Sequence, residues 1–319
     1  MLFRTQRSRF IVFALIGCVA LLTASSLSDA RRHASFLMSG NPPTELAQER
    51  DWLTLISFGG MQGLAQPSLI SAEHPATLTA QAPDLGRHFR ELGIKGSILI
   101  YDSKNNRTYE HNPQRNATAF PPASTFKIFN SMVALETGVI ADDVAVLTWD
   151  GIQRELPEWN HDTNMRQAFK NSTVWFYQVL ARRAGHERMQ QFINQVGYGN
   201  RQIGTAGDID HFWLDKPLRI TPQEQIEFLQ RLYQGLPFSQ RSINLVKDIM
   251  VFEQTPDYKL RAKTGLVSET KPEIGWFVGY LEQNNNVYFF ATNIDVRKPK
   301  DTPARIEVTR RSFKDLGLL

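Results

Sequence analysis

The chain has little of what metal, redox or disulfide chemistry requires. It has 319 residues and one cysteine, Cys18, so no disulfide can form within it. The seven histidines are scattered, no Cys/His cluster has zinc-site spacing and no H-E-x-x-H sequence occurs, so we expect no metal site. His161 precedes Asp162, but no G-x-S-x-G sequence accompanies them, so this pair does not indicate a catalytic triad.

An excess of charge of one sign is also missing. The formal net charge is +4, and lysine and arginine are spread along the chain, so we expect no nucleic-acid partner. We found no internal repeats or low-complexity tracts. Because 42% of the residues are hydrophobic, the chain can bury a sizeable core in one or two domains.

The apolar run near the N-terminus is shorter than a membrane span. Residues 10–24 are apolar and follow three arginines, as in an export signal, whereas a span needs roughly 20 apolar residues. We therefore expect residues 1–30 to be a signal peptide and the protein to reach the periplasm. The L-I-G-C sequence that ends at Cys18 is similar to a lipoprotein box, so a membrane-anchored form stays open as the less favoured alternative.

Residues 31–80 contain no motif that indicates a function. We expect them to form a leader or linker of unknown role. The apolar run within them is short and interrupted by glycine. The pattern of a folded domain begins near residue 80, so we expect the catalytic domain over residues 81–319.

Within that domain, strand patterns lie at both ends and helix patterns between them. Strands are expected over 95–103, 107–112, 258–265, 274–283 and 286–295, and helices over 85–93, 165–169, 174–185, 187–197, 221–235 and 306–317. This order predicts an α+β fold: an antiparallel β-sheet flanked by helices, with a mainly helical lobe.

The sequence Ser124-Thr125-Phe126-Lys127 lies at the start of a further helix pattern. Ser124 has N-cap chemistry, so we expect the helix to begin there and Lys127 to lie on the same face one turn on. A serine becomes a nucleophile when a base takes its proton, and a lysine of lowered pKa is such a base. The tetrapeptide by itself favours a helix cap followed by a surface lysine over a catalytic pair.

Two later motifs favour the catalytic interpretation. Ser172-Thr173-Val174 opens a helix pattern, and Lys263-Thr264-Gly265 ends a strand pattern. S-x-x-K, S-x-V and K-T-G together resemble the set of penicillin-recognising serine enzymes. In that chemistry the first serine attacks a strained amide, and the later serine relays a proton to the leaving nitrogen. Lys263 and Thr264 present a charge and a hydroxyl to a substrate carboxylate.

In detail the chain resembles the class D, oxacillinase-type, serine β-lactamases. The resemblance covers most of the domain but not residues 1–80. It rests on motifs in family order: P-A-S-T-F-K at 122–127, W-D-G at 149–151, S-T-V at 172–174, Y-G-N at 198–200, F-W-L at 212–214, K-T-G at 263–265 and G-W-F-V-G at 275–279.

The resemblance implies roles for individual residues. Ser124 would be the acylated nucleophile, and Lys127 would carry a carboxylate added from CO2, with no other cofactor. Trp213 would steady that carbamate, and Val174 would keep its pocket apolar. Binding of the β-lactam would fall to Lys263, Thr264, Gly265, Leu266 and Arg305, with the N–H groups of Ser124 and Leu266 as the oxyanion hole.

The implied activity is hydrolysis of a β-lactam, a cyclic amide, which would confer resistance to these antibiotics. Two alternatives stay open: a non-hydrolytic β-lactam sensor and a penicillin-binding protein of the cell wall. Val174 argues against the latter, which usually has S-x-N. The sequence leaves the choice among penicillins, cephalosporins and carbapenems open, and equally the choice between monomer and homodimer.

Overall fold

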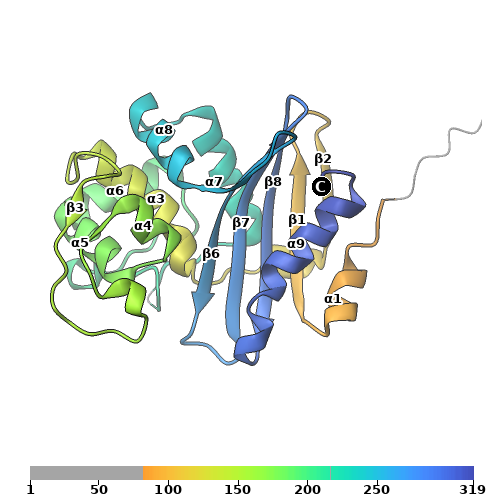
Figure 1. The fold of residues 1–319 in the computed structure, drawn as a ribbon, viewed down its shortest axis with the longest axis horizontal. Helices are drawn as coiled ribbons and strands as arrows, with labels where there is room; N and C mark the ends of the chain where they lie inside the picture. The colour runs from red at the N-terminus through yellow and green to blue at the C-terminus, as the bar shows by residue number, and fades with distance from the viewer. Residues whose placement is uncertain (1–81, 216) are drawn as a thin grey trace, which may run out of the picture. The chain divides into compact units, whose positions relative to one another are not determined.

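The computed structural model describes residues 82–215 and 217–319, so the expected signal peptide and leader lie outside the described residues. In the described part, six strands form one antiparallel sheet in the order β2-β1-β8-β7-β6-β5 (Figure 1). The bounds are Gly96–Asp102 (β1), Arg107–His111 (β2), Val251–Gln254 (β5), Lys259–Val267 (β6), Glu273–Gln283 (β7) and Asn286–Val296 (β8). The α+β prediction is confirmed.

Helices flank this sheet and form a lobe at its β6 side (Figure 1). They are α1 (Gly86–Leu92), α2 (Pro113–Asn116), α3 (Lys127–Glu136), α4 (Met165–Lys170), α5 (Val174–Ala184), α6 (His186–Val196), α7 (Pro222–Gln234), α8 (Gln240–Ile249) and α9 (Ala304–Asp315). The lobe also holds a two-stranded ribbon of β3 (Val146–Leu147) and β4 (Thr163–Asn164).

Both faces of the inner strands β1, β6, β7 and β8 are largely buried. Ile98 and Ile100 of β1 pack with Phe313 of α9 in one hydrophobic cluster, whereas Leu99 joins the other cluster, on the face of α7 and the lobe. Side chains of a strand alternate between faces, so a strand covered on both sides reads as an uninterrupted apolar run. This explains why the sequence pattern located these strands.

Local signals set the ends of the best predicted elements. Thr221 and Glu224 form a capping box at the start of α7, and Gly235 ends it in a left-handed conformation. Asn284 and Asn285, at φ of 52° and 55°, form the two-residue hairpin turn between β7 and β8. Two elements were not predicted: α8, although Ser239 caps it through its side chain, and the short edge strand β5.

Two expected boundaries were wrong. The turn that contains Ser124 is a 3-10 helix over Ala123–Phe126, and α3 begins only at Lys127. Lys263-Thr264-Gly265 lies inside β6, which continues to Val267 because it pairs with β7 along its whole length. Between residues 82 and 319, apart from the undescribed residue 216, no helix is long and apolar enough to cross a membrane.

Candidate active site

The 3-10 turn brings Ser124 and Lys127 together. Side chains three residues apart eclipse one another in a 3-10 helix, which has three residues per turn. Lys127 Nζ accordingly lies 2.8 Å from Ser124 Oγ and donates a hydrogen bond to it. The predicted proximity is confirmed, but its cause is this turn and not a helix cap at Ser124, since the cap position falls on Pro122.

Strand β6 approaches this turn closely. A Cβ on Gly265 would lie 3.2 Å from the Pro122 carbonyl oxygen and 3.3 Å from the Thr125 nitrogen, so a larger residue would press on the Ser124 turn. The residue before the serine, Ala123, has φ of 48°, a conformation unfavourable for a residue with a side chain. Its N–H donates to the Trp213 carbonyl at 2.9 Å, which ties the turn to that segment.

Lys127 lies in an apolar interior. Its side chain is fully buried, and its Nζ lies 5.3 Å from the centre of the Tyr177 ring. Burial lowers its pKa from 10.5 to about 7, because the ammonium loses its hydration. Roughly half of this side chain is therefore a neutral amine at pH 7, against about one in 3,000 for an ordinary lysine.

Trp213 offers a donor in the same interior. Its ring stacks on that of Phe126, with centroids 5.4 Å apart and planes at 20°. Its Nε1 is buried and has no hydrogen-bond partner within the described residues. A buried N–H without a partner costs about 1–3 kcal/mol. A carboxylate on Lys127 would supply the acceptor, so this donor fits the carbamate that the resemblance implies.

Ser172 and Lys263 form a second hydroxyl–amine pair. Lys263 Nζ donates to Ser172 Oγ at 2.7 Å and to the Thr264 carbonyl at 3.0 Å. Ser172 lies between α4 and α5 with φ of 57°, a strained conformation typical of functional sites. Burial holds the pKa of Lys263 well below its usual value, and the charges of Lys127 and Arg305 add to the effect.

Arg305 reaches the site from the first turn of α9. Its Nη1 donates to the Gly265 carbonyl at 3.2 Å. Burial lowers the pKa of its guanidinium to about 10, so it stays charged at neutral pH. Its Nε is buried and has no hydrogen-bond partner among the residues that the structure describes, so it can donate to an anion.

A cleft of about 540 Å³ connects these groups. Its lining includes seven of the predicted residues: Ser124, Ser172, Val174, Thr264, Gly265, Leu266 and Arg305. Lys127 and Lys263 are buried and donate hydrogen bonds to Ser124 and Ser172, which line the cleft. Trp213 is buried directly before Leu214, which also lines it. The structure thus brings every predicted site residue to one place.

Comparisons with known proteins agree with the resemblance to class D serine β-lactamases. The penicillin binding protein transpeptidase domain matches residues 95–316. Beta-lactamase OXA-48 of Klebsiella pneumoniae is 41% identical over 228 residues, 71% of this chain and 85% of that protein. Among solved structures, the class D beta-lactamase YbXI from Nostoc is 70% identical at a TM-score of 0.73, over 74% of this chain and 99% of that one. The class D β-lactamase FUS-1 (OXA-85) from Fusobacterium nucleatum is 39% identical at a TM-score of 0.71, and the match covers 74% of this chain and 98% of that one. The chain belongs to the class D serine β-lactamases.

Several residues that line the cleft of this class D chain were missed from the sequence: Glu155, Leu156, Trp159, Asn171, Leu214, Val267, Ser268 and Glu269. Leu214 lies within the F-W-L motif, and the others lie on loops without a family motif or at positions next to one. The motifs and their flanks were the available signal, since Leu214 is the last residue of F-W-L and Val267 follows Leu266.

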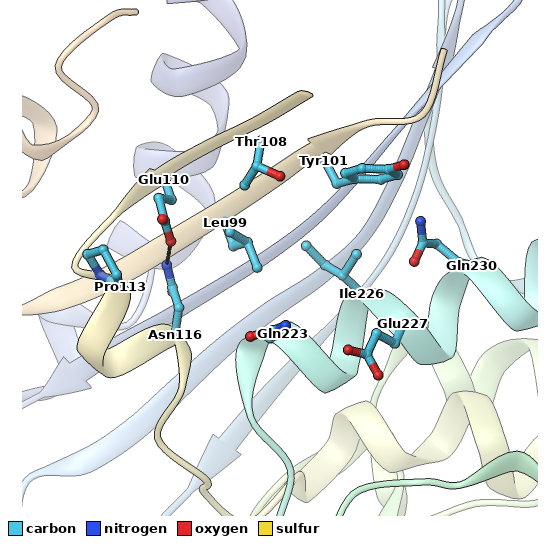
Figure 2. A pocket seen from close by; sticks show the side chains of 10 residues that line it. All are labelled: Leu99, Tyr101, Thr108, Glu110, Pro113, Asn116, Gln223, Ile226, Glu227 and Gln230. Carbon is cyan, nitrogen blue, oxygen red and sulfur yellow. Dashed lines mark hydrogen bonds between the residues drawn. The ribbon is translucent and has the colours of Figure 1, made fainter. Parts of the chain in front are cut away.

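A second cavity, of about 570 Å³, lies away from these residues. Figure 2 shows it between α7 and the outer strands, with Ile226 and Glu227 on one side and Leu99 and Tyr101 on the other. None of the predicted site residues lines it. In the described parts of this class D chain no group of three or more metal-ligating side chains occurs either.

Proposed function

We propose that this protein hydrolyses β-lactam antibiotics through an acyl-enzyme on Ser124, with Lys127 as the general base. The observation that carries the proposal is the contact of Lys127 Nζ with Ser124 Oγ at 2.8 Å in an interior that lowers the pKa of Lys127 to about 7. A base of that pKa accepts a proton near neutral pH.

In the acylation step, Ser124 Oγ attacks the lactam carbonyl carbon and its proton passes to Lys127 in carboxylated form. The lactam C–N bond then breaks, and Ser172 relays to the departing nitrogen the proton that Lys127 took from Ser124, while Lys263 donates a hydrogen bond to the Ser172 hydroxyl. The N–H groups of Ser124 and Leu266 are assigned to the oxyanion that forms on the carbonyl oxygen.

Release of the acyl group requires a base that activates water. We assign this step to Lys127 in carboxylated form, which supplies a carboxylate as proton acceptor. Its neutral amine fraction suits reaction with CO2, and Trp213 has an unpartnered N–H for the resulting anion within the described residues. Val174 lines the same cleft and adds to its apolar wall.

Recognition of the substrate carboxylate is assigned to Arg305, Lys263 and Thr264. Arg305 is fixed by its bond to the Gly265 carbonyl and retains an unpartnered buried Nε in the described part of the chain. Thr264 lines the cleft directly. Such donors favour a planar anion.

Turnover of a chromogenic cephalosporin by the purified protein tests this function. We expect many turnovers per molecule, complete loss in Ser124→Ala, and full activity in Ser103→Ala, which removes an exposed hydroxyl outside the site. A single stoichiometric adduct without turnover would instead favour the sensing or penicillin-binding alternative. An adduct on Ser172 would overturn the assignment of the nucleophile.

A further inference from the structure

The mouth of the cleft carries two carboxylates that the proposed chemistry does not use. Glu155 lines it from the loop before α4, on the side of the helical lobe, and Glu269 lines it from the turn after β6. Both are exposed. Among the residues that line the cleft, Arg305 is the one with a positive side chain, and it is bound to the Gly265 carbonyl.

The loop that presents Glu155 is held in place by hydrogen bonds of Arg154, the residue before it. The side chain of Asn160 accepts a hydrogen bond from the Arg154 backbone N–H at 2.8 Å and donates to its carbonyl at 2.9 Å. The Arg154 guanidinium is bidentate to Asp150, at 2.9 and 2.7 Å. These bonds fix the backbone directly before Glu155. They also pair the positive charge of Arg154 with Asp150, so that it does not neutralise Glu155.

Neither rim carboxylate is neutralised. Glu155 has no hydrogen bond or ion pair among the described residues, and Glu269 accepts one neutral hydrogen bond, from Ser268 Oγ at 3.2 Å. The basic residue nearest to Glu269 in the sequence, Lys271, lines a separate cavity with Arg297 and Lys298. The lining of the cleft therefore pairs one cation, Arg305, with two carboxylates at exposed positions.

We propose that this charge arrangement makes the enzyme prefer β-lactams whose acyl side chain bears an ammonium group and disfavour those whose side chain bears a carboxylate. The inference rests on the proposed function and adds a substrate class to it. In a penicillin the ring carboxylate and the acylamino side chain lie at opposite ends of the bicyclic nucleus. With the ring carboxylate at Arg305, the side chain extends towards the rim, where Glu155 and Glu269 attract a cation.

Three penicillins that share one nucleus test this. Benzylpenicillin has an uncharged side chain. Ampicillin has the same side chain with an α-amino group, and carbenicillin has it with an α-carboxylate. At about pH 6, with bicarbonate held constant, the α-amine is protonated. We expect kcat/KM relative to benzylpenicillin to be higher for ampicillin and lower for carbenicillin. Sodium chloride at about 1 M, where the Debye length is about 3 Å, should compress the difference.

Substitution of the rim isolates its contribution. The double variant Glu155→Gln/Glu269→Gln should reduce the ampicillin-to-carbenicillin ratio of kcat/KM about fivefold, and each single variant about twofold, as for exposed charge pairs. Glu158→Gln, on the same loop but outside the cleft lining, is the matched control and should leave the ratio unchanged. A ratio that stays at the wild-type value in the double variant would overturn the inference.

The two proposals fail separately. If benzylpenicillin is not hydrolysed, the proposed function is wrong, and the same ratio is then measured from the rates at which the three penicillins form adducts. If benzylpenicillin is hydrolysed but the double variant behaves like Glu158→Gln, the function stands and the charge preference is wrong.

Discussion

At the scale of single residues, the chemistry depends on what burial does to an amine. Lys127 is fully buried, and desolvation is the cause of its lowered pKa. The ring of Trp213 stacks on Phe126, the residue before Lys127, and its buried N–H has no partner in the described part of the molecule. A neutral amine and a free donor in one dry pocket are together suited to a lysine carbamate, which neither residue would stabilise alone.

We expect activity to depend on dissolved CO2. Only the neutral amine of Lys127 reacts with CO2, and its fraction falls as the pH drops below a pKa of about 7. Degassed buffer at about pH 6 should therefore lower kcat, and bicarbonate should restore it. A carbamate carbon signal in the 13C NMR spectrum should rise and fall with activity. Activity indifferent to bicarbonate, with no such signal, would mean that Lys127 works as a free amine.

Trp213→Phe separates the donor from the ring. The substitution keeps the stacking on Phe126 but removes the Nε1 donor. We expect the bicarbonate concentration for half-maximal activity to rise about tenfold, in line with one hydrogen bond to a charged group, while the melting temperature changes little. Trp213→Ala should raise the requirement and also destabilise the fold, because a fully buried ring is lost. An unchanged requirement in Trp213→Phe would show that the donor plays no part.

The sequence was informative where spacing alone determined proximity. Ser124 and Lys127 are three apart, and both an α-helix and a 3-10 turn place such residues side by side. The left-handed backbone of Ser172 carries no such local signal, because it is set by the packing between α4 and α5. The rim carboxylate Glu269 was missed for a related reason, since it reaches the cleft through a loop that no motif marks.

At the scale of elements, Tyr198-Gly199-Asn200 acts as a scaffold. Asn200 binds the segment before α7 through its N–H, which donates to the Arg219 carbonyl at 2.9 Å, and through its side chain, which donates to the Pro217 carbonyl at 2.8 Å. Ile220, next in that segment, pairs with Phe120. The chain from Phe120 leads directly into the Ser124 turn, so the motif supports the nucleophile without touching it.

Gly199→Ala should disrupt this scaffold. Gly199 has φ of 52°, and a Cβ there would lie 2.1 Å from the Arg219 carbonyl oxygen, so backbone must move. We expect a loss of more than about 2 kcal/mol in the free energy of unfolding, measured by denaturant titration. Gly207→Ala is the control, because its Cβ would meet nothing closer than 3.7 Å, and should change stability by less than about 0.5 kcal/mol. Equal effects of the two variants would contradict the scaffold role.

Among the elements, those with both a cap and a periodic apolar face were predictable. The helix α7 has Thr221, Glu224 and Gly235 at its ends, and the sequence located it to within a residue. The helix α8 also carries both signals, a cap at Ser239 and buried Ile243, Val246 and Ile249 at helical spacing, so it was predictable although the prediction omitted it. In contrast, β5 is a short, exposed edge strand without an apolar face. Its place in the sheet comes from pairing with β6, which no local pattern encodes.

At the scale of the whole molecule, burial of Lys127 couples stability to pH. The folded pKa is about 7 and the unfolded value 10.5, so between these values the unfolded chain binds more protons. The free energy of unfolding should therefore rise with pH over this window, as the penalty for burying a lysine that is charged when unfolded disappears. Measured in CO2-free buffer, the difference between wild type and Lys127→Met should climb from about pH 7 to 10.5. Lys104→Met, on an exposed turn, controls for loss of charge, and a flat difference would contradict the coupling.

The compartment in which the enzyme acts is an expectation from residues 1–30, which lie outside the described residues. We expect residues 1–30 to direct export, because an apolar run at 10–24 follows three arginines and the targets of β-lactams lie outside the inner membrane. No disulfide has to form after export, because Cys18 is the sole cysteine. Cell fractionation should place the activity in the periplasm, and intact mass should give a mature start between about residues 24 and 31.

Two variants distinguish the routes to that compartment. Leu15→Arg interrupts the apolar run and should retain full-length protein in the cytoplasm, because a charge in this region opposes insertion. Cys18→Ser removes the residue that a lipid anchor would need, and in a soluble exported protein it should change neither the fractionation nor the mature mass. Membrane-bound activity that Cys18→Ser releases would identify a lipoprotein instead, and full-length wild-type protein in the cytoplasm would exclude export altogether.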